Sequence, residues 1–193
     1  MGRYAKILST GMYLPKKVET NEELGKRIGF DVDGWLRPRT GITLRYISAP
    51  NEGTSDMATE AGRQALNNAK LNPEDLDLLI LATDTPDFVS PPTSAVIQHK
   101  LGAKNAGCFD VNAACTDVPI ALSVASNYIM NDPSINYVLV TGSYGMTKWL
   151  DWNEKWLAPI FSDGAGAIIM APSDEPGYIT SKTIADGSYW DCY

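Results

Sequence analysis

The sequence predicts an α/β fold built on a mainly parallel β-sheet. Short apolar segments alternate along the chain with segments whose apolar residues recur at helical spacing, which is the pattern of strands joined by helices. The segment 78–82 (LLILA) is apolar at every position, which is typical of a strand buried on both faces of its sheet. No linker or low-complexity stretch divides the 193 residues, so we expect one continuous unit over residues 1–193.

Local signals set the bounds of the predicted elements. Gly11 interrupts the first strand and Pro15 closes it, whereas Thr20 and Glu23 have the spacing of a capping box at a helix start. Asn72 caps a short helical turn that begins with a proline. In chain order, we expect a strand over 5–14, helices over 20–28 and 55–69, a helical turn over 73–76, a strand over 78–82, a helix over 93–101, a strand over 108–111, a helix over 118–130, and strands over 137–141, 164–170 and 178–184.

Composition and charge restrict the classes to which the chain can belong. A net charge of −7 at pH 7 disfavours nucleic acid and anionic membranes as partners. The chain has no apolar run of roughly 18 residues, the length of a membrane span, and no visible signal peptide. Three cysteines are an odd number without metal-ligand spacing, which favours a reducing compartment. We therefore expect a cytoplasmic protein with no metal site, and no membrane or nucleic acid as partner.

Cys115 is the candidate nucleophile. It lies between the predicted strand over 108–111 and the predicted helix over 118–130, and Pro119 fits the first turn of that helix. A helix N-terminus favours a thiolate, and a thiolate readily attacks a thioester. A lone cysteine is more often buried and inert, so the residues alone leave both interpretations open. The single histidine, His99, is expected on a helix surface.

Five segments together resemble the N-terminal half of a β-ketoacyl-acyl carrier protein synthase III, one of the thiolase-fold condensing enzymes. They follow one another in the order and spacing of that family, and they are residues 11–15, 35–42, 113–115, 161–167 and 185–188. The resemblance implies a thiolase-like fold whose first half has a mixed, mainly parallel sheet of five strands flanked by helices. It also implies that the C-terminal half, which would carry the family's catalytic His and Asn, is absent from residues 1–193.

The resemblance implies a transferase that acts in fatty acid biosynthesis or a related lipid pathway. Cys115 would take an acyl group from acyl-coenzyme A, and in the complete protein malonyl-ACP or malonyl-CoA would then condense with it by decarboxylation. The implied partners are acyl carrier protein or coenzyme A thioesters, a second copy in a homodimer and the missing half, with no cofactor. Two alternatives stay open: an acyltransferase to a hydroxyl or amine without condensation, and a non-catalytic half-chain that pairs with a separate second half.

The resemblance also assigns residues to the substrate. Trp35 and Arg39 match family residues that hold the coenzyme A end, by stacking on adenine and by contacting phosphate. Lys155 falls where the family often has an arginine that meets phosphate or the carrier protein. Ser90 falls where other members carry a bulky aromatic in the acyl pocket, on a loop that can reach across the dimer. From the residues alone, we favour the other interpretation, in which Trp35 packs under a surface loop and Arg39 lies in solvent.

Asp117 is a departure from the family pattern. A carboxylate in the first helical turn suits the helix dipole, but a carboxylate beside Cys115 would raise the thiol pKa. We favour an outward-pointing residue at the helix start over one that faces the sulfur. The tryptophan-rich segment 149–156 has two open interpretations, a flap packed on the core and a lid over the substrate entrance.

The predicted half-fold carries an expectation about solubility. The runs 78–82 and 118–130 are too apolar to face water, so we expect a second half or a complementary chain to cover them. Residues 1–193 alone should then be inactive in condensation.

Overall fold

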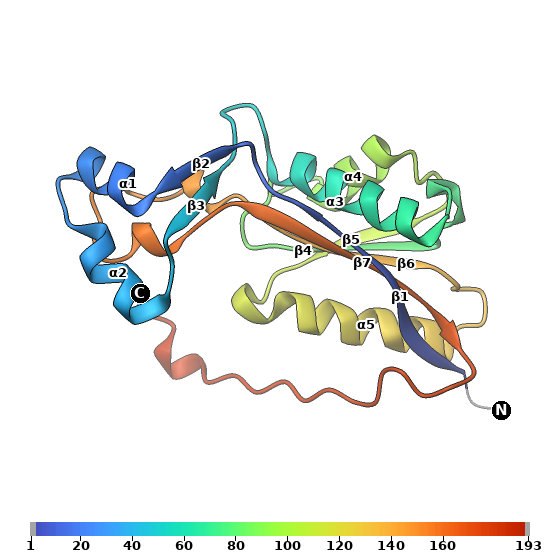
Figure 1. Cartoon of the computed structure of the whole chain (residues 1–193). Helices are drawn as coiled ribbons and strands as arrows, with labels where there is room; N and C mark the ends of the chain where they lie inside the picture. Colours follow the sequence, from blue (N-terminus) through green and yellow to red (C-terminus); the bar gives the residue numbers. More distant parts are fainter. Residues whose placement is uncertain (1–2, 192–193) are drawn as a thin grey trace.

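The structure is a computed structural model that describes residues 3–191. Its centre is a five-stranded sheet in the order β1-β7-β6-β4-β5 (Figure 1). β4 is parallel to β5 and β6, whereas β7 is antiparallel to β6 and to β1. Four of the five strands therefore point the same way, and the predicted mainly parallel sheet is confirmed. The strands are β1 (Tyr4–Tyr13), β4 (Leu78–Ala82), β5 (Gly107–Val111), β6 (Val138–Tyr144) and β7 (Gly164–Ser173).

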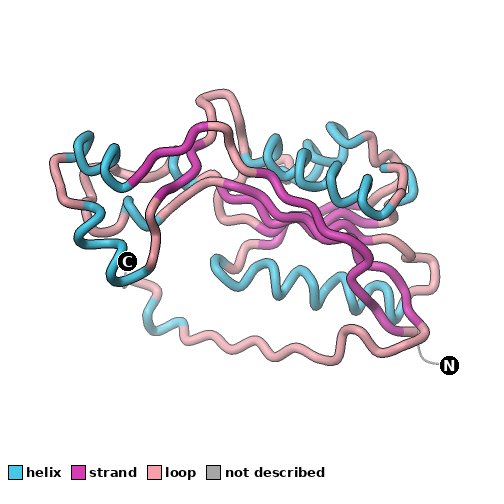
Figure 2. The backbone as a smooth tube through the Cα atoms, viewed as in Figure 1, coloured by secondary structure: helices cyan, strands magenta, loops and turns pink. Residues whose placement is uncertain are grey.

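Helices cover both faces of the sheet, and the alternation of helix and strand is clear in Figure 2. α3 (Thr54–Ala69) and α4 (Thr93–Leu101) lie on one face, and α5 (Asp117–Asn131) lies on the other (Figure 1). β1 comes very close to α3, since a Cβ on Gly11 would lie 2.2 Å from the carbonyl oxygen of Ala61. Glycine therefore allows the long helix to pack directly on the first strand.

The apolar run of β4 is covered within this chain. All five of its residues are buried. Leu79 and Leu81 belong to the core cluster under α3 and α4, and Leu78 and Ile80 belong to the cluster under α5. The expectation that a second half must cover this run is wrong, because the helices of the same chain already enclose both faces. α5 likewise buries its own inner face, including Ala125, against the sheet.

A smaller unit of two strands and two helices packs beside the sheet (Figure 1). β2 (Lys17–Thr20) and β3 (Leu44–Ile47) pair antiparallel, and α1 (Asn21–Ile28) and α2 (Val32–Thr40) accompany them. Thr20 and Glu23 form the capping box that the sequence predicts. β2, β3 and α2 are not among the elements that the sequence predicts.

α2 occupies the segment around Trp35 and Arg39, which the sequence indicated as part of a surface loop. The Asp31 side chain caps its start by accepting from the Gly34 N–H at 3.0 Å. Gly41 ends it in the left-handed conformation, with φ of 76°. The helix buries Leu36. The loop interpretation is therefore wrong, because capping and burial outweigh the poor helix propensities of the glycine and proline inside the segment.

The predicted strand over residues 178–184 is also wrong. This stretch is irregular and mostly exposed, and it runs beneath α5 (Figure 1). The Tyr178 N–H donates to the Ala5 carbonyl at 2.7 Å. Among the described residues, this is the one backbone hydrogen bond between the segment and β1. The Ser123 hydroxyl of α5 lies within hydrogen-bond distance of the Tyr178 and Ser181 hydroxyls, at 3.0 and 2.8 Å. The segment is therefore held by side chains on a helix and not by a strand ladder.

The remaining predicted helices and strands agree with the structure to within a few residues. The short 3-10 turns are η1 (Pro73–Asp75), η2 (Ala114–Thr116), η3 (Met146–Lys148), η4 (Ala158–Ile160) and η5 (Gly187–Tyr189). Among the helices of residues 3–191, none combines the length and the apolar character that crossing a membrane requires.

Candidate active site

Cys115 lies in the tight turn η2 between β5 and α5. Ala114 has a left-handed backbone with φ of 49°, a conformation that costs a residue with a Cβ on the order of 1 kcal/mol. Thr116 closes the turn, since its N–H and its hydroxyl donate to the Ala113 carbonyl at 3.2 and 2.8 Å. α5 begins at Asp117, so the predicted position of Cys115 at a helix start is confirmed. Cys115 is exposed.

A cavity of about 780 Å³ opens beside Cys115. Its walls come from β1, from the ends of β4 and β6, and from the start of β7. β4 and β6 are parallel, so their carboxyl ends meet at one edge, which is where sheets of this class commonly bind ligands. Tyr144 and Phe161 form an aromatic part of the wall, with ring centroids 6.1 Å apart.

Asp163 is a structural member of the cavity wall. One of its carboxylate oxygens accepts from the Ser48 N–H at 2.8 Å and from the Ser48 and Thr147 hydroxyls at 2.7 and 2.5 Å. The other oxygen accepts from the Thr147 N–H at 2.9 Å. Four donors therefore satisfy this buried carboxylate and tie β3 to η3 across the start of β7.

Asp117 faces the same cavity as Cys115 and is only 9% exposed. Burial raises the pKa of its carboxyl, the Val118 backbone N–H opposes that shift, and the nearby Asp84 adds to it. An outward-pointing residue would not be buried in this way, so the structure favours the alternative in which Asp117 points inward, toward the cavity that Cys115 also lines.

Asp84 follows β4 and lines the cavity from the side of the sheet. Its Oδ1 atom is buried without a hydrogen-bond partner among the described residues. Burial and the nearby Asp84, Cys115 and Asp117 raise the pKa of the Tyr144 hydroxyl to about 12. Tyr144 therefore remains a neutral donor at any ordinary pH.

The sequence did not single out Asp84, Tyr144 or Phe161 as site residues. Asp84 follows β4, and Tyr144 ends β6. These two strands are adjacent in the sheet but are not consecutive in the sequence. Only the strand order brings these positions together. The available signal was the rule that carboxyl ends of parallel strands share an edge.

Trp35 and Arg39 lie together on α2. The Arg39 guanidinium stands over the Trp35 ring at 5.8 Å and donates to the Trp35 carbonyl at 2.6 Å. The Trp156 ring meets Trp35 edge-on, with centroids 5.2 Å apart and planes at 72°, and it also meets Phe30 at 4.8 Å. Lys155 is exposed next to Trp156 in the chain. The structure thus brings the Trp35–Arg39 pair and the end of the tryptophan-rich segment to one surface.

The tryptophan-rich segment has the packing expected of a flap, and its role as a lid over the substrate entrance stays a prediction. Trp152 is held under the Arg27 guanidinium at 4.4 Å and donates to the Thr147 carbonyl at 3.3 Å, as expected for a packed flap. Trp149 and Trp156 are 68% and 59% exposed, and this exposure leaves them free to meet a ligand.

The other sequence candidates lie away from the cavity. Ser90 is on an exposed loop and is not among the residues that line the Cys115 cavity. His99 is exposed on α4. Cys108 is half-buried in β5, and Cys192 lies outside the described residues.

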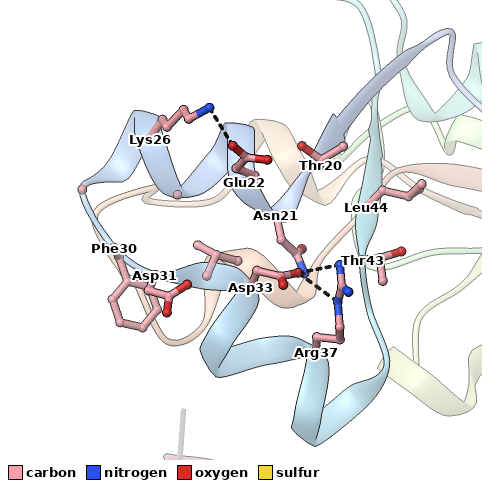
Figure 3. Close-up of a pocket in the computed structure, with 13 residues that line it drawn as sticks. Thr20, Asn21, Glu22, Lys26, Phe30, Asp31, Asp33, Arg37, Thr43 and Leu44 are labelled. Carbon is pink, nitrogen blue, oxygen red and sulfur yellow. Dashed lines mark hydrogen bonds and ion pairs between the residues drawn. The ribbon is translucent and has the colours of Figure 1, made fainter.

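A second hollow, of about 850 Å³, lies between α1, α2 and β3. Figure 3 shows that Asp33 points toward Asn21 and Arg37, whose side chains donate to it at 3.0 and 3.1 Å, and that Lys26 reaches Glu22 at 2.8 Å. These polar groups satisfy one another, and no cysteine is among the described residues that line the hollow. The reactive chemistry of the described residues therefore centres on the Cys115 cavity.

Comparisons with known proteins give relatives of one kind. The family model of 3-oxoacyl-[acyl-carrier-protein] synthase III matches residues 109–187. A β-ketoacyl-[acyl-carrier-protein] synthase III of Neisseria gonorrhoeae is 46% identical over 97% of this chain and 58% of its own length. One from Methylococcus capsulatus is 43% identical over 99% of this chain and 59% of its own length. The chain thus spans less than two thirds of the length of these relatives.

Solved structures of similar proteins have the same fold. The priming β-ketosynthase of the R1128 polyketide pathway matches with a TM-score of 0.87 and 38% identity, over 91% of this chain and 52% of that one. The 3-oxoacyl-[acyl-carrier-protein] synthase III of Aquifex aeolicus matches with a TM-score of 0.84 and 40% identity, over 89% and 55%. In sequence and in fold, this chain is therefore synthase III-like, and it resembles the thiolase-fold condensing enzymes, as its motifs predict.

Proposed function

We propose that this chain carries the acyl-accepting cysteine of a β-ketoacyl-acyl carrier protein synthase III-type enzyme. The position of Cys115 is the observation that supports this most. It is exposed in a strained turn before α5 and opens into a cavity at the carboxyl edge of the sheet. A buried inert cysteine would need neither that exposure nor that turn.

The Cys115 sulfur attacks the thioester carbonyl of acyl-coenzyme A. The carbon–sulfur bond of the donor breaks, coenzyme A leaves as its thiolate, and the acyl group stays on Cys115. The Cys115 N–H lies at a helix start, where amide groups lack intrahelical acceptors, and it serves as one oxyanion donor. The coenzyme A end lies along Trp35, Arg39 and Lys155, which share one surface with Trp156.

The second step belongs to the whole protein. A malonyl thioester loses CO₂, and the resulting enolate attacks the acyl-Cys115 carbonyl to give a β-ketoacyl product. Residues beyond this chain supply the His and Asn that stabilise the enolate, and a homodimer lets the loop with Ser90 reach the partner's acyl pocket. The protein works in the cytoplasm, with acyl carrier protein or coenzyme A as carrier and no cofactor.

One observation favours a second candidate function. Asp117 and Asp84 place carboxyl groups in the cavity of the nucleophile, and a carboxylate can take the proton of an attacking hydroxyl or amine. Transfer of the acyl group to such an acceptor, without condensation, would use these groups directly.

The test is product analysis with the complete protein, acyl-CoA and malonyl-acyl carrier protein. We expect CO₂ release and a β-ketoacyl product that Cys115→Ser abolishes and the control Cys108→Ser retains. Consumption of acyl-CoA without CO₂, with ester or amide formation when an alcohol or amine is added, would replace condensation by the second candidate. Turnover that survives in Cys115→Ser would refute both.

A further inference from the structure

The cavity beside Cys115 carries negative charge that its lining does not balance. Three aspartates line it, and none of its described lining residues is a lysine, arginine or histidine. One of the three, Asp163, is fully engaged by Ser48 and Thr147. The uncompensated carboxyls are therefore those of Asp84 and Asp117.

Both carboxyls are held where a ligand would meet them. The Oδ1 atom of Asp84 is fully buried and has no donor within the described residues, and an unpaired buried acceptor is unfavourable. Asp117 is nine-tenths buried, and the Val118 backbone N–H is the donor among the described residues that lowers the pKa of its carboxyl. An arriving group with N–H donors and positive charge would satisfy both.

The shared cavity indicates which part of a substrate reaches these groups. Cys115, Asp84 and Asp117 all line it, and Cys115 is exposed. An acyl chain bound to the sulfur would extend from the thiol into the cavity, so its far end would meet the aspartates. The other titratable groups around them are Tyr144, which stays neutral, and Asp163, which is already saturated.

We propose that Asp84 and Asp117 make Cys115 selective for an acyl group that bears an ammonium group. They disfavour an acyl group that ends in a carboxylate, because a second negative charge would enter a cavity without a cation. The inference rests on the proposed function, since it takes Cys115 to be the residue that holds the acyl group.

Charged thiol reagents test the preference without a substrate. The probes are the 2-aminoethyl, propyl and 2-sulfonatoethyl methanethiosulfonates, which attach a cationic, neutral or anionic tail to a thiol. Rates are measured for each cysteine by peptide mass mapping, and each rate is divided by the rate of the same reagent with glutathione. At pH 8 we expect Cys115 to prefer the cationic over the anionic tail by about tenfold or more, a modest value for unit charges a few ångströms apart.

Variants assign the preference to the two residues. Asp84→Asn and Asp117→Asn should each reduce the preference several-fold. The control Asp174→Asn removes the same charge from an exposed site at the far end of β7 and should leave it unchanged. If a variant does not fold, the unmodified protein still decides, since its preference should shrink as the pH is lowered and the carboxyls gain protons.

Acyl donors extend the test to the reaction. 3-Aminopropanoyl-CoA should acylate Cys115 several-fold faster than butanoyl-CoA, which has nearly the same shape, and succinyl-CoA should be slowest. A fast Cys115 with no charge preference would overturn the inference and leave the proposed function standing. A Cys115 that reacts no faster than Cys108 with every reagent would instead overturn the proposed function.

Discussion

Cys115 lies at a position that combines exposure with a constrained backbone. The left-handed Ala114 directs the chain sharply from β5 into α5, and Thr116 fixes the turn through its hydroxyl. The thiol therefore stands at the helix start and not along the helix. Sequence spacing could predict this placement because the small residues and Pro119 leave little room for another helix start.

Alkylation rates test the placement of Cys115. Iodoacetamide should modify Cys115 more than tenfold faster than Cys108, because Cys108 is half-buried in a strand and Cys115 is exposed at a helix start. Quenched time points and peptide mass mapping give both rates in one sample. Equal rates in the folded protein would contradict the assignment, and unfolding in urea should equalise them as a control.

Asp117 should make the fold less stable as the pH rises. Its pKa is raised in the folded state, so the folded protein binds this proton more tightly than the unfolded chain. Stability is then lost as the pH rises from the ordinary Asp pKa through the raised folded value. Asp117→Asn should therefore be more stable than the parent at pH 7, with a gap that closes near pH 4, by urea unfolding at each pH. A gap independent of pH would contradict the burial of a charged Asp117.

The coenzyme A contact can be tested on one helix. Arg39→Ala should weaken coenzyme A binding by about 1–3 kcal/mol, the range for a lost charged hydrogen bond, and Trp35→Ala should weaken it by a similar amount. Arg37→Ala is the matched control, because Arg37 lies on the same helix but pairs with Asp33. If calorimetry shows unchanged affinity for coenzyme A in both test variants, the binding role of Trp35 and Arg39 is contradicted and their role is structural.

Elements with strong local signals are the ones that the sequence predicts correctly. The capping box of α1 and the uniformly apolar β4 need no knowledge of the rest of the chain. α2 is different, since glycine and proline inside it oppose a helix, and the burial of Leu36 and the caps decide the outcome. The stretch 178–184 has strand-like composition, but Ser123 of α5 holds its side chains away from the sheet edge.

The capping box makes a measurable contribution to the small unit around α1. Thr20→Ala removes the side chain that accepts from the Glu23 N–H and should cost about 1 kcal/mol in the free energy of unfolding. Glu22→Ala, on the same turn, removes only an exposed ion pair with Lys26 and should cost less than about 0.5 kcal/mol. Urea titrations that rank the two variants in the opposite order would contradict the capping role.

The whole chain buries its main core but leaves apolar side chains outside. Exposed apolar side chains lie near both ends of the chain. Near the first end they are Ile7 and Met12 on β1 and Leu14 after it, and near the other end they are Ile184 and Trp190. The sequence predicted exposed apolar surface in β4 and on the inner face of α5, and this was wrong. The sequence could not show that α3, α4 and α5 cover both faces of the sheet. Part of this exposed apolar surface lies on the first strand and the last segment, and part lies on the tryptophan-rich segment.

These exposed groups lead us to expect association of residues 1–193. Sedimentation velocity over a hundredfold range of concentration should show dimers or larger species, because association buries exposed apolar surface. Ile7→Lys with Met12→Lys should shift the distribution toward monomer. A monomer at all concentrations that also carries out decarboxylative condensation would contradict the expectation that further residues are required.

The central claim is that Cys115 holds the acyl group as a thioester. The direct measurement is the mass of each cysteine-containing peptide after incubation with acyl-CoA, an acid quench and digestion. The peptide with Cys115 should gain the mass of the acyl group, the gain should vanish in Cys115→Ser, and Cys108→Ser should keep it. An acyl group on Cys108, or undiminished acylation of the Cys115→Ser protein, would contradict the claim.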